Sequence, residues 1–264
     1  MNESKAVKGT KGNFAVLHFI KYKLKANLKA EASRNYLGYL WWLLEPAMLL
    51  GVFYFVFGVL LNYGRDGFES YLLVGITFWL VFANTVTHSC NSIQTASGII
   101  QQVYVPKWVF PVIAVLSNYV KFLFVLLTLF GFAIYSGFLP DVSWLGLLYF
   151  IPIYLIFVMG CALVAAAITP IFPDIKFIIQ AGIQMLMFGS GIFYQYDMIP
   201  EKYLDLFLLN PVARAIYYFR EIILFQKSPD FFDLLYILIF GVILIGIGLA
   251  ILLKLDRRYP RLVI

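Results

Sequence analysis

The stretch Leu234–Leu253, LLYILIFGVILIGIGLAILL, contains no charged residue. A bilayer core of about 30 Å is crossed by about 20 apolar residues in a helix, which is the length of this stretch. Similar stretches occur earlier in the chain, without the ten-residue alternation that a membrane β-barrel needs. They are Leu43–Leu61, Tyr71–Thr95, Val112–Gly137, Leu145–Thr169 and Phe177–Tyr194. We therefore predict an all-α integral membrane protein with six transmembrane helices.

The composition argues against a soluble protein. Of the 264 residues, 62% are hydrophobic and 13% are charged, whereas a soluble domain is roughly 45–50% apolar and roughly 25% charged. The high hydrophobicity also excludes intrinsic disorder. Cys90 and Cys161 each lie inside an apolar run and lack the spacing of metal ligands, so we expect neither a disulfide scaffold nor a metal site.

Basic residues are distributed unevenly along the chain, and their distribution predicts its orientation. Eight Lys and Arg precede the first span and four follow the last, with Lys107 and Lys176 in connectors on the same side. Five lie on the other side: Arg65, Lys202, Arg214, Arg220 and Lys227. Cytoplasmic loops are enriched in basic residues, so we expect both termini in the cytoplasm and a location in the cytoplasmic (inner) membrane. Lys121 alone lies inside a span, near enough to the cytoplasmic face to snorkel.

We predict a single permease-like domain over residues 1–264. Its parts are a cytoplasmic interfacial segment (1–42), a six-helix bundle (43–253) and a cytoplasmic tail (254–264). The basic N-terminal cluster favours a membrane surface, rather than nucleic acid, as its partner.

Two flanking segments carry further structure. Apolar residues recur at helical spacing from Phe14 to Leu28 beside a row of lysines, which is typical of an amphipathic helix lying in the headgroup layer. An ordinary basic tail is the alternative. The outer segment Gln195–Phe232 is broken at Asn210-Pro211 and is too long for a simple turn, so we expect short outer re-entrant helices there.

Two predicted spans carry polar faces. Because unpaired polar groups are costly in hydrocarbon, such faces lie against protein or water. One interpretation is the wall of a hydrated substrate channel, and the other is hydrogen bonding between helices, worth about 0.6 kcal/mol per contact. His88 has no acid at helical spacing, so it does not indicate a proton relay. The residues concerned are Asn84, His88, Asn91 and Thr95 on the second span, with Gln180 and Gln184 on the fifth.

Aromatic residues, 19% of the chain, supply further channel candidates. Trp41 and Trp42 precede the first span, and Phe53 and Phe57 share one of its faces. Tryptophans at this depth usually form an interfacial belt. The negative face of an aromatic ring also attracts the C–H groups of sugars, so the four residues are candidates for a channel lining as well.

Motifs for catalysis are missing from the sequence. It has no G-x-x-x-x-G-K-[ST] phosphate loop, so this chain cannot bind and hydrolyse ATP by that route. It also lacks H-E-x-x-H, G-x-S-x-G and any cluster of Asp and His. We expect no enzymatic activity and no cofactor on this chain.

Three sequence segments carry a family resemblance. Arg34–Pro46, RNYLGYLWWLLEP, resembles the R-x-x-x-L-G-x-L-W-x-L-L-E-P motif of type-2 ABC permeases that export polysaccharides. These permeases are the membrane subunits for O-antigen, capsule and teichoic acid export. Val103–Pro111 (VYVPKWVFP) resembles their coupling segment and Asn210-Pro211 their outer N-P break. Pro173–Lys176 (PDIK) resembles their R-D-I-x loop, with proline in place of the usual arginine.

The resemblance implies a transport permease that works as a homodimer with two copies of an ATPase subunit, which holds the ATP and Mg²⁺. The cargo would be a polyprenyl-linked polysaccharide, as in lipopolysaccharide biosynthesis, in contact with membrane lipids. Lys29 and Arg34 would bind the lipid phosphate. The ATPase-coupling residues would be Gln101, Gln102, Tyr104, Pro106, Lys107 and Asp174, and the outer gate Asn210, Pro211, Tyr217 and Tyr218.

Three other functions remain open from the sequence. One is a type-2 ABC permease for a drug, lipid or peptide. Another is a membrane-embedded acyl- or glycosyl-transferase, which needs paired acids or a His-Asp pair that His18 and His88 lack. The last is a scaffold subunit without a pore.

Overall fold

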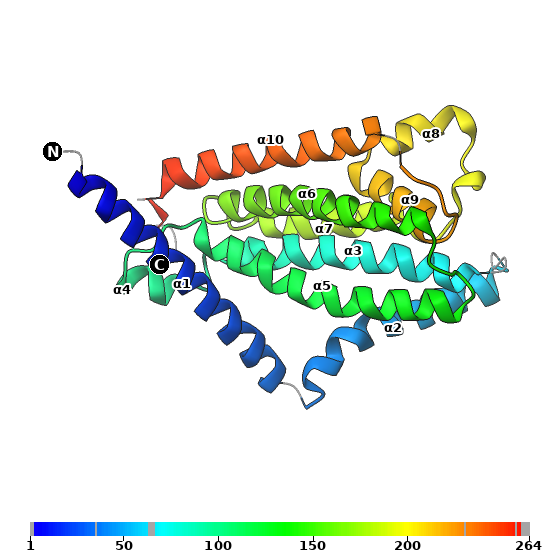
Figure 1. Ribbon diagram of the computed structural model, residues 1–264, viewed down its shortest axis with the longest axis horizontal. Helices are drawn as coiled ribbons and strands as arrows, with labels where there is room; N and C mark the ends of the chain where they lie inside the picture. Colours follow the sequence, from blue (N-terminus) through cyan, green and yellow to red (C-terminus); the bar gives the residue numbers. More distant parts are fainter. Residues whose placement is uncertain (1–2, 35, 63–66, 230, 257, 260–264) are drawn as a thin grey trace.

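A computed structural model describes residues 3–34, 36–62, 67–229, 231–256 and 258–259, with the backbone alone at 3–14, 34, 231 and 233. All regular secondary structure in these residues is helical (Figure 1). Within them, helices long and apolar enough to cross a membrane cover Gly38–Leu60, Phe68–Asn91, Val109–Tyr135, Val142–Ile168 and Leu234–Leu255. The protein is therefore a multi-pass, all-α membrane protein, as predicted.

The elements follow one another along the chain in an up-and-down arrangement. Their bounds are α1 (Glu3–Arg34), η1 (Gly38–Leu40), α2 (Trp41–Phe53), η2 (Tyr54–Leu60), α3 (Phe68–Asn91), α4 (Ser97–Gln102), α5 (Val109–Tyr135), η3 (Val142–Gly146), α6 (Leu147–Ile168), α7 (Ile175–Phe188), η4 (Tyr196–Met198), α8 (Glu201–Leu208), α9 (Pro211–Ile223) and α10 (Phe231–Leu255).

The bundle has two distinct ends. The first turns of α1 and the last turns of α10 lie at one end, where α1 crosses the bundle obliquely and α4 lies beside it (Figure 1). We refer to this as the terminal end. The short helices α8 and α9 lie at the opposite, distal end (Figure 1).

The predicted fifth span is shorter than expected. The helix α7 has 14 residues, and at a rise of 1.5 Å per residue it is about 21 Å long. The backbone turns at Gly191, whose φ of +68° is strained for residues with a side chain. The count of six transmembrane helices therefore stays a prediction, with five helices of full length in the described part of the chain.

The helix α3 forms the centre of the core. It packs against α5, α6 and α9, and most of its side chains are buried. At its middle, the ring of Phe78 stacks on Phe219 of α9, and the hydroxyl of Tyr154 on α6 donates to the carbonyl oxygen of Phe78 at 2.7 Å. A helix from the distal end thus reaches the mid-depth of the bundle.

The N-terminus of α9 has the local chemistry that the sequence indicates. The side-chain oxygen of Asn210 accepts a hydrogen bond from the Val212 amide at 3.0 Å, and Pro211 occupies the first turn. Asparagine is a preferred N-cap and proline a preferred first residue. The break at Asn210-Pro211 and the short helices on either side of it are therefore confirmed.

Close backbone contact joins α6 to α10. A Cβ added at Gly160 would lie 2.6 Å from the carbonyl oxygen of Gly241, and one added at Gly241 would lie 2.7 Å from Cα of Phe157. One added at Gly248 would lie 2.8 Å from Cβ of Leu163. Small residues let membrane helices approach closely, which gives van der Waals packing where the hydrophobic effect between helices is weak.

Candidate functional site

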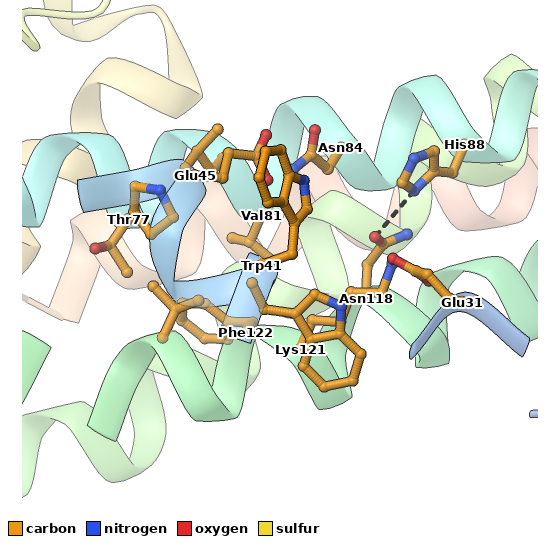
Figure 2. Close-up of a pocket in the computed structure, with 14 residues that line it drawn as sticks. Glu31, Trp41, Glu45, Thr77, Val81, Asn84, His88, Asn118, Lys121 and Phe122 are labelled. Atoms are coloured by element: carbon orange, nitrogen blue, oxygen red, sulfur yellow. Dashed lines mark hydrogen bonds and ion pairs between the residues drawn. The ribbon is translucent and has the colours of Figure 1, made fainter. Parts of the chain in front are cut away.

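Several predicted channel residues meet in a cavity between α1, α2, α3 and α5, towards the terminal end (Figure 2). We call it the proximal cavity; its volume is about 230 Å³. Trp41 and Trp42 enter from the start of α2, while Asn84 and His88 project from α3. The polar residues Glu31, Glu45, Asn118 and Lys121 also line it.

An ion pair closes one side of the proximal cavity. The Lys121 ammonium on α5 lies 2.6 Å from a carboxylate oxygen of Glu31 on α1. The lysine side chain is 15% exposed and the glutamate 41%, so solvent screens the pair only in part. The ammonium also lies 5.9 Å from the centre of the Trp42 ring, at the limit of a cation–π contact. Lys121 therefore extends towards α1, and the expectation that it snorkels towards the cytoplasmic face stays a prediction.

His88 is held by an amide on the neighbouring helix. Its Nδ1 lies 3.0 Å from Oδ1 of Asn118 (Figure 2). The Asn118 amide nitrogen donates to the Ala114 carbonyl at 2.9 Å, which fixes the amide orientation. Nδ1 of His88 is therefore the donor, and Nε2 is left as an acceptor in the neutral ring.

A second cavity of about 230 Å³ lies beside the first and shares His88 with it. Lys23 and Asn27 of α1 line it together with Thr95. Thr95 lies past the end of α3, and its hydroxyl donates to the Asn91 carbonyl at 3.0 Å. The prediction that Thr95 continues the helical face of Asn84 and His88 is therefore wrong, although Thr95 still lies next to His88 at this cavity.

The other predicted channel residues lie elsewhere. Gln180 is half-buried and Gln184 exposed on α7, and neither lines the proximal cavity. Phe53 and Phe57 pack on Phe193, with ring centres 4.4 and 5.0 Å apart. The predicted channel residues are thus divided among separate places in the chain rather than lining one wall.

The predicted ATPase-coupling residues lie in the connectors at the terminal end. Gln101, Gln102, Tyr104 and Asp174 are exposed, and Pro106 is partly so. Lys107 differs, because its side chain is 1% exposed and its ammonium donates to the Val105 carbonyl at 3.0 Å. Lys107 therefore cannot contact a partner directly, and it instead stabilises the conformation of the connector before α5.

An aspartate that the sequence did not single out holds this segment in place. One carboxylate oxygen of Asp256 accepts from the Lys107 amide and the other from the Tyr104 hydroxyl, both at 2.8 Å. Asp256 directly follows α10, so two segments about 150 residues apart are joined here. No local pattern could have indicated the contact.

The predicted phosphate-binding residues are only partly described. Lys29 is exposed on α1. The side chain of Arg34 lies outside the described residues. Glu31, between them in sequence, pairs with Lys121.

The predicted outer-gate residues gather at the distal end. The amide nitrogen of Asn210 donates to the Gly189 carbonyl at 3.2 Å and to the Ser190 hydroxyl at 3.1 Å, so it ties α9 to the end of α7. Tyr217 and Tyr218 pack edge to face with ring centres 5.1 Å apart. All three, with Pro211, belong to the start or body of α9.

Arg220, which sequence reasoning placed only in an outer loop, organises this end. Its side chain is 1% exposed, and it donates to the carbonyls of Tyr71 (3.1 Å), Gly191 (2.6 Å) and Ile192 (3.0 Å). The guanidinium lies 3.5 Å from the centre of the Tyr71 ring. The close approach requires Gly75, where an added Cβ would lie 2.5 Å from the guanidinium. Arg220 thus fastens α9 to α3 and to the turn after α7.

Comparison with known proteins extends over most of the chain. The profile of the ABC-2 type transporter family matches residues 19–224. An O-antigen export system permease protein of Klebsiella pneumoniae is 29% identical over 240 residues, which cover 89% of this chain and 91% of that protein. A namesake in Myxococcus xanthus is 23% identical, covering 78% and 80%. The polysialic acid transport protein KpsM of Escherichia coli is 24% identical, covering 85% and 88%.

Proposed function

We propose that this chain, which belongs to the ABC-2 type transporter family, is the transmembrane subunit of an ATP-driven exporter of lipid-linked polysaccharide. The observation that carries the proposal is the similarity, over 85–89% of the chain, to permeases named for O-antigen export and polysialic acid transport. Polysaccharide cargo is thereby favoured over a drug or a peptide.

ATP hydrolysis takes place on a separate subunit in this proposal. The terminal end offers a docking surface of exposed Gln101, Gln102, Tyr104 and Asp174, with Phe172 63% exposed beside Asp174. The shape of the surface is fixed from within, since Asp256 holds both Tyr104 and Lys107. A movement of the ATPase would therefore displace α10 as well as α5. Because α10 packs along α6, α6 would be displaced with it.

The cargo enters near α1. The proximal cavity combines two tryptophans with two asparagines, two glutamates, a histidine and a lysine, which suits a ligand with both apolar and polar parts. Lys29 and Arg34 attract the lipid phosphate at the membrane surface, where α1 lies in the headgroup layer. Trp41, Trp42, Asn84 and His88 are then the first channel residues that the glycan meets.

The complete channel requires a second copy of the chain. The first span is largely unburied in one protomer, with 6% of its apolar window covered, and α7 exposes Gln184 and Met185. In a homodimer these faces, together with Phe53 and Phe57, would border a shared path. The charge distribution supports cytoplasmic termini, and the family of ATP-driven exporters supports a location in the inner membrane.

Deleting the gene in its host tests the proposal. We expect the surface polysaccharide to disappear and its lipid-linked form to accumulate inside the cell, and a plasmid copy of the gene to reverse both effects. Unchanged surface polysaccharide, with no internal accumulation, would contradict polysaccharide export. Extraction of the lipid-linked glycan followed by mild acid release and gel analysis gives both readings.

A further inference from the structure

A separate cavity lies at the distal end, away from the proximal cavity and its neighbour. Its volume is about 470 Å³, within the roughly 300–1,000 Å³ of small-molecule sites. It is formed by the start of α3, the turn that follows α5 and the C-terminal half of α9. We call it the distal cavity.

Aromatic rings from four parts of the chain line the distal cavity. Tyr71 comes from α3, Phe138 from the turn after α5, Tyr196 from the segment after α7, and Tyr217 and Phe225 from α9 and the residues that follow it. Tyr196 and Tyr217 pack edge to face with ring centres 4.8 Å apart. Such rings offer flat, partly apolar surfaces to a ligand.

Polar groups complete the wall. Gln195 supplies an amide, and Asp197 and Glu221 supply carboxylates. The ammonium of Lys227 lies 3.0 Å from the Glu221 carboxylate, and this hydrogen bond raises the pKa of the lysine. A charged carboxylate accepts hydrogen bonds from hydroxyl groups more strongly than a neutral acceptor does.

The charge behind the wall decides what kind of ligand fits. Aromatic rings with nearby carboxylates could also enclose an organic cation. Here, however, the Arg220 guanidinium already lies 3.5 Å from the Tyr71 ring centre and 5.7 Å from that of Tyr196. Its positive charge already interacts with the faces of these two rings and repels a second cation. A neutral ligand with hydroxyl groups is not repelled.

We propose that the distal cavity is a binding subsite for neutral sugar units, with ring faces against the C–H surfaces of the sugar and with Asp197, Glu221 and Gln195 accepting or donating hydrogen bonds to its hydroxyls. The identity of the ligand rests on the proposed function, because the sugar is a unit of the exported glycan. The subsite holds the glycan as it leaves the distal end, which opposes its return between transport cycles.

The test measures binding to the full chain in detergent, without ATPase. The probe is the host's own surface glycan, released from its lipid by mild acid, and calorimetry gives the dissociation constant. Three variants change the cavity wall: Asp197→Asn, Glu221→Gln and Phe225→Ala, the last at a side chain that is 53% exposed. Two matched controls lie on α8 outside the cavity: Asp205→Asn, and Tyr203→Ala at a side chain that is 50% exposed.

We expect the wild type and both controls to bind alike, and Asp197→Asn and Glu221→Gln each to bind about tenfold more weakly, because a neutral amide oxygen accepts a hydrogen bond less strongly than a carboxylate does. Phe225→Ala should also weaken binding. The proposal is overturned if the wild type does not bind, if the wall variants bind as tightly as the wild type, or if choline chloride competes with the glycan. Export by the complete transporter is measured separately, so that a failed subsite and a failed proposed function give different results.

Discussion

Replacing Arg220 by methionine, a side chain of similar length without charge, tests how the distal end is held together. The guanidinium donates to three backbone carbonyls and is 1% exposed. Tyr71 lies inside α3, so its carbonyl keeps a helical N–H donor. The substitution leaves the Gly191 and Ile192 carbonyls without this donor, and each buried unsatisfied group costs about 1–3 kcal/mol. The expected destabilisation is therefore about 2–6 kcal/mol, at the upper end for single substitutions.

Thermal unfolding of the purified protein in detergent, followed by tryptophan fluorescence, gives the comparison. For a chain of this size about 1 kcal/mol corresponds to about 2–4 °C, so Arg220→Met should lower Tm by at least about 4 °C. Arg220→Lys separates charge from geometry. A compact ammonium cannot reach three carbonyls as the planar guanidinium does, so we expect the lysine to recover less than half of the loss.

Arg214→Met on the same helix is the control. Arg214 donates through Nε to the Leu208 carbonyl at 2.8 Å and stacks on Tyr236, and its side chain is only half-buried. Its replacement should shift Tm less than that of Arg220. The reasoning would be refuted if Arg220→Met changed Tm by less than about 2 °C, below the cost of one unsatisfied carbonyl.

Three further outcomes are expected. Glu31→Lys or Lys121→Glu alone should expose α1 to proteolysis, and the double exchange should restore much of the protection, because the attraction survives the swap. Gly241→Ala should lower stability by about 1–3 kcal/mol through overpacking, whereas Gly246→Ala, where an added Cβ meets nothing within 4 Å, should not lower it; thermal unfolding measures both. Tyr104→Ala should reduce the amount of ATPase that co-purifies, because it removes a side chain that is 73% exposed in the docking surface.

Each of these outcomes can fail in a defined way. Single-charge variants that leave α1 fully protected would show that the ion pair does not hold α1. Equal loss of stability at Gly241 and Gly246 would remove the argument from close helix contact. Tyr135→Ala, at an 86% exposed residue of the distal end, is the control for Tyr104→Ala, and equal ATPase loss in both would contradict a docking role.

The features that sequence predicted well depend on local chemistry or on length. The long apolar stretches gave the membrane class and most span positions, since about 20 such residues have few alternatives. The Asn210-Pro211 break was predictable because an N-cap and a first-turn proline act within one helical turn. For the same reason the short helices around it were foreseeable.

The features that sequence missed depend on contacts between distant segments. Glu31 and Lys121 are 90 residues apart, and Arg220 lies 149 residues from Tyr71. A single basic residue in an amphipathic outer segment does not reveal that it points into the core. The polar face of the second span and the length of the fifth span were extended too far for a related reason. α3 ends at Asn91 and α7 at Phe188, where tertiary packing and the turn at Gly191 override the helical periodicity.

The central claim is that this chain forms the path while a different chain hydrolyses ATP. Proteoliposomes containing the chain alone, the ATPase from the neighbouring gene alone, or both together can be loaded with lipid-linked glycan and assayed for ATP hydrolysis and for glycan reaching the opposite leaflet. We predict ATP-dependent glycan transfer only when both proteins are present. Glycan transfer or ATP hydrolysis by this chain alone would contradict the claim.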